Sequence, residues 1–374
     1  MISNITKEKK EFYINLLAEI VSKKSVLKDE YLVADVIKDF LNSINVSYDV
    51  HFLDEQRPNV IAKIGSGKKK LLLVCHMDVV EGSGVWEFDP FVLSEQNGKL
   101  IGRGVADNKG PLVSLLILID SLKSENFDGE LQILFASDEE KSGPNGLKYL
   151  LREDLIHADF AIVADTPGEF NKIMVAERGS LNVGVIAKGK QVHSAYTHLD
   201  GDNPIDKMAS FIVKLSSYEL NHDPHKYLTP PSLSFVKING GFANNVVPSV
   251  CEATINIRYV VNQSVDEILS ELKDIAGDNF EFRVKSYTVP SEVNEDHESI
   301  SLLRSVAQKH GFNPILTGLD SGTDCKKLVH AGIPAVGYCF PKEGVAHQVN
   351  EWIWEEDLFI YADLMKDFVI EFFK

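Results

Sequence analysis

Acidic residues and histidines follow most of the short apolar runs in this sequence. The residues concerned are His76 and Asp78 after the run 71–75, Glu139 and Glu140 after 131–136, Asp165 after 160–164, and His347 after 335–338. Asp107 lies just before a further apolar, helix-like pattern. In an open α/β sheet, ligands bind beyond the carboxyl ends of the strands. We therefore expect these side chains to gather at one rim of a sheet.

Each of these residues also has an ordinary structural explanation. Asp107 could cap a helix, the pair Glu139 and Glu140 could be solvated, and His347 could be a surface residue. Together, however, two histidines and several carboxylates would repel and desolvate one another unless a cation lay among them. A metal ion is the most economical explanation.

The donor types narrow the choice of metal. Nitrogen and oxygen ligands without a thiolate suit zinc, with cobalt or manganese as possible substitutes. One metal ion needs three or four protein ligands, and this set contains more. The count therefore favours two metal ions with a bridging carboxylate.

The elements that must position these residues alternate between short strands and longer helices. Strands are predicted at 71–75, 131–136 and 160–164, and helices at 108–123 and 144–152. This rhythm predicts an α/β domain with a largely parallel sheet. It resumes after about residue 291, with helices predicted at 300–310, 323–330 and 355–373 and strands at 314–317 and 335–338.

The middle of the chain has a different pattern. Apolar and polar residues alternate over 181–188 and 251–259, which is typical of strands with one covered face. Helices are predicted at 204–215 and from 265, where Ser264 and Glu267 form a capping box, and further strands at 232–238 and 280–284. The order β-α-β-β-α-β is that of a ferredoxin-like domain. We expect this α+β domain, residues 178–290, to be inserted into an α/β domain of residues 1–177 and 291–374.

Composition excludes several classes of protein. The chain has 374 residues, 38 Lys and Arg against 55 Asp and Glu, and a net charge of −17. This charge argues against binding of nucleic acid or an anionic membrane, and favours small-molecule or peptide partners. The charged N-terminus and the absence of a long apolar run predict a cytoplasmic protein. Cys75, Cys251, Cys325 and Cys339 show no CxxC spacing, so most are expected to be core residues.

Several motifs with possible chemistry occur along the chain. They are Cys75-His76-Met77-Asp78, Gly102-Arg103-Gly104-Val105-Ala106-Asp107-Asn108-Lys109-Gly110, Ser137-Asp138-Glu139-Glu140, Gly189-Lys190-Gln191-Val192-His193-Ser194-Ala195, Asn244-Asn245-Val246-Val247-Pro248, and Ala346-His347-Gln348-Val349-Asn350-Glu351. Together these motifs resemble the M20 family of co-catalytic zinc amidohydrolases and peptidases, and the resemblance covers nearly the whole chain. It implies an αβα zinc-hydrolase catalytic domain and an inserted domain that serves as lid and dimer surface.

The resemblance also implies a role for each residue of the rim. His76 and Asp165 would bind one zinc ion, Glu140 and His347 the other, and Asp107 would bridge the two. Asp78 would orient the imidazole of His76. Glu139 would be the general base that takes a proton from the water between the metals and passes it to the leaving amine.

Residues of the inserted domain and of its junction would complete the site. His193 would stabilise the tetrahedral oxyanion in the active site of the partner in a homodimer. Arg258 would bind a substrate carboxylate, with Arg178, Asn245 and Thr323 as further substrate contacts. As ordinary structural residues, His193 would be a turn histidine, Arg258 a cross-strand partner of an acid, and Asn245 a turn residue.

Within the family, Arg178-Gly179-Ser180 together with the Asn244–Pro248 loop is most similar to the succinyl-diaminopimelate desuccinylases. We therefore expect a metal-dependent deacylase that cleaves the amide bond of an N-acyl amino acid. Acetylornithine deacetylase and a small M20 exopeptidase or dipeptidase are the alternatives, because Asp107-Asn108-Lys109-Gly110 is also common among the dipeptidases.

Two other classes compete with this interpretation. A non-catalytic binding protein on the same scaffold is possible in principle because fold does not determine function, but a pure binder has no reason to need five ligands and Glu139. A serine or cysteine hydrolase lacks support, because the sequence has no Gly-x-Ser-x-Gly elbow and no activated cysteine context. The HExxH motif of other zinc peptidases is absent too.

Overall fold

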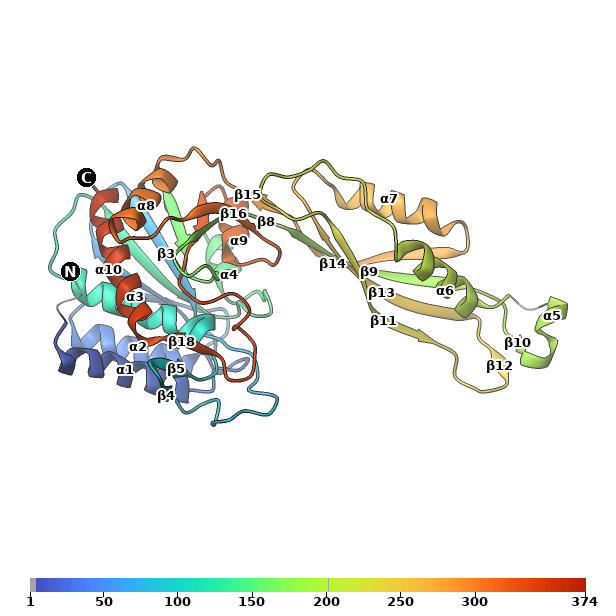
Figure 1. Cartoon of the computed structure of the whole chain (residues 1–374), viewed down its shortest axis with the longest axis horizontal. Helices are drawn as coiled ribbons and strands as arrows, with labels where there is room; N and C mark the ends of the chain where they lie inside the picture. Colours follow the sequence, from blue (N-terminus) through green and yellow to red (C-terminus); the bar gives the residue numbers. More distant parts are fainter. Residues whose placement is uncertain (1–4, 201) are drawn as a thin grey trace. The chain divides into compact units, whose positions relative to one another are not determined.

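The computed structural model describes residues 5–200 and 202–374, and these divide into two compact units (Figure 1). Unit 1 comprises the chain up to Val175, together with Val293–Thr317 and Thr323–Lys374. Unit 2 comprises Ala176–Glu292 and Gly318–Gly322. Unit 2 is thus inserted into the chain of unit 1.

The large sheet is mixed rather than largely parallel. Its middle strands are parallel neighbours in the order β6 (Glu130–Ala136), β3 (Lys70–His76), β7 (Phe160–Val163) and β17 (Ala335–Gly337). The outer strands are β1 (Tyr48–His51) and β2 (Asn59–Gly65) at one edge, and β8 (Lys172–Glu177), β15 (Ser291–Glu292) and β16 (Ile315–Leu319) at the other. The pairs β1–β2, β2–β6, β8–β17 and β8–β15 are antiparallel. The connection 52–58 between β1 and β2 is shorter than the dozen or so residues that a parallel crossover requires, and the two strands accordingly pair antiparallel.

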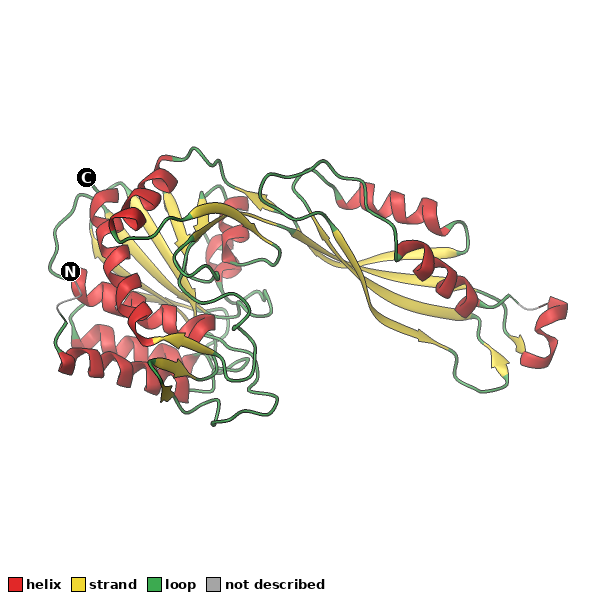
Figure 2. Cartoon of the chain, in the orientation of Figure 1, coloured by secondary structure: helices red, strands yellow, loops and turns green. Residues whose placement is uncertain are grey.

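Helices cover both faces of this sheet, as Figure 2 shows. On one face, α4 (Leu147–Arg152) and α9 (Asp324–His330) pack in one core with apolar residues of β3 and β6. On the other, α3 (Gly110–Leu122) contacts β3 and lies against α10 (Glu355–Phe372) and α1 (Lys7–Ser22). Further helices are α2 (Tyr31–Ser43), which contacts β2, and α8 (Glu298–Lys309), which contacts α10. Helix α3 is buried almost all round, which explains its nearly continuous apolar sequence.

Unit 2 has the predicted ferredoxin-like order. It runs β9 (Gly179–Lys188), α6 (Pro204–Leu215), β11 (Ser232–Gly240), β13 (Val250–Tyr259), α7 (Val265–Ala276) and β14 (Phe280–Thr288). The sheet order is β11-β13-β9-β14, with every neighbouring pair antiparallel. Phe211 of α6 and Leu272 of α7 pack against one face of the sheet and form a core that belongs to unit 2 alone. The predicted α/β fold with an inserted α+β domain is therefore confirmed.

Shorter elements complete the described chain. They are the irregular turn η2 (Val105–Lys109), the strands β4 (Ser94–Gln96), β5 (Lys99–Ile101) and β18 (Trp352–Trp354) of one small sheet, the pair β10 (Val192–His193) and β12 (Val246–Val247), the 3-10 turn η3 (Ser194–Tyr196), and α5 (Thr197–Asp200). All four cysteines are free and buried, as expected for core residues. Over the residues that the structure describes, no helix combines the length and apolar character needed to cross a membrane.

The capping box at the start of α7 is present in full. The hydroxyl of Ser264 accepts a hydrogen bond from the backbone N–H of Glu267 at 3.2 Å, and the Glu267 carboxylate accepts one from the Ser264 N–H at 2.9 Å. We expect Ser264→Ala to destabilise α7 by about 0.5–2 kcal/mol. Amide hydrogen exchange in the first turn of α7 should accelerate accordingly. The matched change Ser270→Ala, at an exposed site in the same helix, should leave exchange unchanged or slower. Equal effects of the two changes would contradict the assigned role of the cap.

Candidate metal centre

The carboxyl ends of the parallel strands bring five of the predicted residues together. His76 is the last residue of β3, Asp165 follows β7, and Glu140 lies in the loop after β6. His347 lies in the loop between β17 and β18, and Asp107 lies in η2. Because β6, β3, β7 and β17 are parallel neighbours, their carboxyl ends meet at one edge of the sheet. The convergence predicted from the sequence is present in unit 1.

Asp107 is not a helix cap. Helix α3 begins at Gly110, two residues later than predicted from the sequence, and Pro111 stands in its first turn. Asp107 and Asn108 have non-helical backbone angles, and the turn follows Gly104, whose φ is +86°. A side chain at Gly104 would be strained at that φ and would place its Cβ 2.6 Å from Val79. The turn thus directs Asp107 away from the helix and toward His76.

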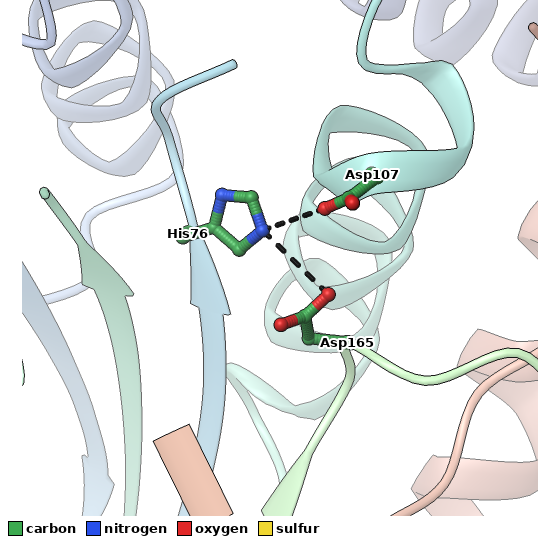
Figure 3. A group of neighbouring side chains, drawn as sticks. All are labelled: His76, Asp107 and Asp165. Carbon is green, nitrogen blue, oxygen red and sulfur yellow. Dashed lines mark hydrogen bonds and ion pairs between the residues drawn. The ribbon is translucent and has the colours of Figure 1, made fainter. Parts of the chain in front are cut away.

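The first group consists of His76, Asp107 and Asp165 (Figure 3). The Nε2 atom of His76 lies 2.8 Å from Asp107 Oδ1 and 3.6 Å from Asp165 Oδ1. His76 is buried, and both carboxylates are largely buried. One imidazole nitrogen and two carboxylates that converge in this way could hold one metal ion.

The second group consists of Asp107, Glu140 and His347. The Nε2 atom of His347 lies 3.0 Å from Asp107 Oδ2 and 3.1 Å from Glu140 Oε2. Asp107 therefore faces the first group with Oδ1 and the second with Oδ2. In each group the potential ligand atoms lie within 4.8 Å of one another. Two sites that share one carboxylate are the arrangement that a bridged pair of metal ions needs.

The charges of the chain favour cations at this edge. Burial and the charge of Asp107 raise the pKa of Asp165 to about 7. Burial opposes protonation of His76, but Asp165 and Asp107 outweigh burial and raise the pKa of His76 well above its ordinary value. Hydrogen bonds to Asp107 and Glu140 raise the pKa of His347 to about 10. The carboxylates thus keep positive charge at the places where a divalent ion would displace protons.

Glu139 and Asp78 lie beside the two groups and belong to neither. Burial and the charge of Asp165 raise the pKa of Glu139 well above its ordinary value. The Nδ1 atom of His76 lies 3.0 Å from the backbone oxygen of Asp78 and 3.7 Å from its carboxylate. The carboxylate of Asp78 accepts hydrogen bonds from the backbone N–H groups of Glu139 and Glu140, at 3.1 and 3.0 Å. Asp78 therefore contacts both His76 and the loop of the acidic pair.

Four of the other predicted residues lie in unit 2, namely Arg178, His193, Asn245 and Arg258. His193 is exposed in β10, opposite Val246 of β12, and the backbone oxygen of Asn245 accepts a hydrogen bond from the N–H of Ser194 at 2.9 Å. The structure therefore brings His193 and Asn245 together. Arg258 lies on the face of β13 opposite the helices, half-buried, beside Ser180 of β9.

Arg178 and Thr323 have evident structural contacts. Arg178 is buried, donates a hydrogen bond to the backbone oxygen of Pro230 at 2.8 Å and pairs with Asp320 at 3.1 Å. Burial lowers the pKa of Arg178, which the charge of Asp320 partly offsets. The hydroxyl of Thr323 accepts a hydrogen bond from the N–H of Cys325 at 3.2 Å and so caps α9. Their role as substrate contacts stays a prediction.

Sequence reasoning assigned no role to two residues that hold the Asp107 turn. The buried carboxylate of Glu351 accepts hydrogen bonds from the N–H groups of Gly104, Ala106 and Asp107 and pairs with Arg103 at 2.6 Å. The amide of Asn108 accepts a hydrogen bond from the N–H of His76 at 3.2 Å and donates one to the backbone oxygen of Ala164 at 2.6 Å. Both residues lie inside the quoted motifs. Glu351, however, is 244 residues from Asp107, so no local pattern indicates that the two are in contact.

Comparison with known proteins identifies the family. A model of peptidase family M20/M25/M40 matches residues 72–371, and the chain belongs to this family. A relative from Staphylococcus aureus strain N315, named probable succinyl-diaminopimelate desuccinylase, is 29% identical over 402 residues, which cover 96% of this chain and 97% of the relative. The succinyl-diaminopimelate desuccinylase of Ehrlichia canis is 26% identical over 376 residues, with coverage of 96% and 98%.

Solved structures show the same fold. Aminopeptidase PepT from Bacillus cereus has a TM-score of 0.80 at 21% identity, over 98% of this chain and 99% of that chain. A dinuclear metal-binding peptidase of the M20 family from Bacillus subtilis has a TM-score of 0.77 at 14% identity, with coverage of 98% and 99%. The expectation of a hydrolase of the metallopeptidase and amidohydrolase class, acting on C–N bonds, is confirmed.

The shared position of Asp107 leads to a test of the metal stoichiometry. We expect the wild-type protein to bind two zinc ions per chain, because two ligand groups are present. Asp107→Asn should weaken both sites by at least about 10²-fold, since changes around a ligand already cost about 10–100-fold. Asp165→Asn should weaken one site only. Elemental analysis against a competing chelator measures both constants.

The control for this test is Asp154→Asn, which changes an exposed carboxylate outside both groups and should bind zinc like the wild type. A wild-type protein that binds one ion with zinc in excess would contradict the two-site geometry. So would an Asp107→Asn variant that loses only one of its two ions.

Proposed function

We propose that this protein is a two-metal deacylase that hydrolyses the amide bond of an N-acyl amino acid. The observation that carries the proposal is the pair of ligand groups joined by Asp107, with Glu139 beside them and in neither. A site for two cations and a free carboxylate is what metal-assisted amide hydrolysis requires.

The residues present fit two zinc ions. His76 and Asp165 would hold one ion, Glu140 and His347 the other, and Asp107 would contact both. These donors are imidazole and carboxylate without thiolate, which suits zinc, with cobalt or manganese as substitutes. When bound, such a pair of ions polarises the substrate carbonyl and lowers the pKa of water.

Glu139 is the proposed general base. Its carboxylate belongs to neither ligand group, so it keeps the basicity that coordination to a metal ion would lower. It takes a proton from the attacking water and delivers that proton to the leaving nitrogen. Asp78 accepts hydrogen bonds from the backbone N–H groups of Glu139 and Glu140, and therefore fixes the position of the base relative to the neighbouring ligand.

For the substrate, the sequence similarity supports an N-acyl amino acid with more than one carboxylate, as in a succinyl-diaminopimelate desuccinylase. The relatives with that name match at 26–29% identity over 96% of this chain. Arg258 is the proposed partner of a substrate carboxylate, with Arg178, Asn245 and Thr323 as further contacts. Acetylornithine deacetylase and an M20 exopeptidase or dipeptidase are the alternatives, and the second is favoured by the peptidase structures that share the fold.

We also propose that the active unit is a homodimer formed through unit 2. Strand β11 is an edge strand of the unit 2 sheet, and it exposes Val236 and Ile238, which are 60% and 55% exposed. Helix α6 exposes Val213, which is 69% exposed. An unpaired edge next to exposed apolar side chains is commonly covered by a symmetry mate. His193 would then stabilise the oxyanion in the site of the other subunit.

A substrate panel tests the proposed activity. The zinc-loaded protein is assayed against N-succinyl-diaminopimelate, N-acetylornithine, and a set of di- and tripeptides. We expect the highest kcat/KM for the succinyl compound. A higher kcat/KM for a peptide would replace the deacylase by an exopeptidase, and no hydrolysis of any compound by a fully metallated protein would favour a binding protein.

Glu139→Gln should lose most of the rate and keep both metals. The amide has nearly the same shape as the carboxylate but cannot accept the proton of water. General-base catalysis contributes about 10²–10⁴-fold, so kcat should fall by that factor. Steady-state kinetics and elemental analysis of the same preparation measure the two properties.

The adjacent change Glu140→Gln is the matched control. It should lower zinc occupancy at one site, because Glu140 belongs to the second ligand group. If the two variants exchanged these phenotypes, the roles of base and ligand would be reversed. A loss of less than about tenfold in Glu139→Gln would assign the proton to another group.

The dimer proposal predicts complementation between two inactive variants. His193→Ala should lose about 10²–10³ in kcat with both metals bound, as expected for the loss of one oxyanion donor. Glu139→Ala should also be nearly inactive. After subunit exchange, about half of the dimers are mixed and each has one intact site, so about a quarter of the wild-type activity should return.

Each variant incubated alone under the same conditions is the control and should stay inactive. Exchange itself is verified with two different affinity tags. No recovery in verified mixed dimers would mean that His193 acts on its own subunit or not at all. A monomer in analytical ultracentrifugation with full activity would exclude the dimer as the active unit.

A further inference from the structure

Each backbone N–H group of the loop 137–140, which carries Glu139 and Glu140, is hydrogen-bonded to a side chain from another part of the chain. Four consecutive N–H groups, from residue 137 to residue 140, donate hydrogen bonds to side-chain oxygens. The acceptors, in chain order, are Asn59 Oδ1 at 3.0 Å, Glu30 Oε1 at 3.3 Å, Asp78 Oδ1 at 3.1 Å and Asp78 Oδ2 at 3.0 Å. All three acceptor residues are buried. The conformation of this loop therefore depends on side chains from other parts of unit 1.

Arg57 connects one of these acceptors, Glu30, to Asp138 of the loop itself. Its guanidinium donates to Glu30 through Nε at 2.9 Å and through a second nitrogen, and it pairs with Asp138 Oδ1 at 2.7 Å. The side chains of all three residues are at most 5% exposed. The charge of Asp78 also acts on Arg57. One arginine thus stands among three buried carboxylates, which would otherwise repel one another.

Asp138 is the point at which the loop turns. Its φ is +59°, in the left-handed region, which few residues other than glycine adopt readily. One carboxylate oxygen binds Arg57, and the other accepts hydrogen bonds from the N–H of Asn145 at 3.1 Å and from its side chain at 2.7 Å. A Cβ at Gly143 would lie 1.9 Å from Asp138 Oδ2, so the loop packs tightly around this carboxylate.

We propose that Arg57 is a positioning residue for catalysis, which fixes Glu30 and Asp138 so that the loop 137–140 presents Glu139 to the water. The planar guanidinium is suited to this task, because it binds two carboxylates in a defined geometry through a rigid fork. The inference rests on the proposed role of Glu139 as the base. Arg57 itself touches no substrate and is not a catalytic residue.

Arg57→Lys tests the proposal, because lysine keeps the charge and loses the fork. We expect kcat to fall by about 10–10²-fold, the effect of a small misplacement of a catalytic group, with KM changed less than about twofold and both zinc ions retained. Hydrogen exchange of a peptide covering 137–142 should be faster than in the wild type. The control Arg152→Lys changes an exposed arginine paired with Glu153 and should behave like the wild type.

Asp138→Asn is the second variant, for the case that Arg57→Lys folds poorly. Asparagine tolerates the left-handed conformation and keeps an oxygen for Arg57, but it removes the charge and the oxygen that accepts the two hydrogen bonds from Asn145. A smaller fall in kcat, again with both zinc ions and unchanged KM, would support the proposal. Wild-type kcat in either well-folded variant would overturn it. A loss of activity that merely follows loss of zinc or of folded protein in both variants would also overturn it.

The readouts separate this inference from the proposed function. If Glu139→Gln kept full activity, the assignment of the base would fail, whereas exchange in 137–142 would still report whether Arg57 holds the loop. If Glu139→Gln lost activity and Arg57→Lys changed neither kcat nor exchange, the base would stand and the role of Arg57 would fall.

Discussion

The repulsion between buried carboxylates at one edge of the large sheet is the constraint on which the rest of this structure depends. Asp107, Asp165 and Glu140 converge there, and burial makes their charges costly unless cations balance them. Among the described residues, the ion-pair partners of these three carboxylates are histidines only. Two of the carboxylates that hold the surrounding loops are paired with arginine: Glu351 with Arg103, and Glu30 with Arg57. The permanent cations thus serve the scaffold, and the centre keeps groups that exchange a proton for a metal ion.

The loops that carry the candidate ligands Asp107 and Glu140 are fixed through their backbone N–H groups, which donate hydrogen bonds to buried carboxylates. Glu351 accepts N–H groups around Asp107, and Asp78 accepts those of Glu139 and Glu140. A buried carboxylate that binds backbone N–H groups fixes a loop more firmly than a contact with a mobile side chain would, because charge-assisted hydrogen bonds are strong and directional. Each such acceptor comes from a distant part of the chain. The ligand loops can therefore depart from regular secondary structure without losing their position.

This dependence on distant partners explains what the sequence could and could not predict. Helix α6 and the capping box of α7 follow from local periodicity and capping, and the residues of the rim follow from their place after apolar runs. The antiparallel edge strands β1 and β2 did not follow, because a short strand pattern does not specify its neighbour. The side chains that bind the backbone of the loop 137–140 could not be predicted from the sequence either. The Arg57–Glu30 pair spans 27 residues and the Asp138–Glu30 bond spans 108, and neither separation leaves a periodic signal.

The division of the chain into two units separates the two halves of the proposed function. All five candidate ligands and Glu139 lie in unit 1, whereas His193, Asn245 and Arg258 lie in unit 2, which has a hydrophobic core of its own. A change in the polar face that carries Arg258 therefore leaves the metal-binding edge intact, since no side chain of that face contributes to either ligand group. Proteins that share this fold bear the names of an aminopeptidase, a tripeptidase and a dipeptidase. In the proposed function, a hydrolytic centre in unit 1 is combined with a separately folded unit that contacts the substrate. Family membership therefore specifies the class of bond that is cleaved more firmly than the acyl group that is released.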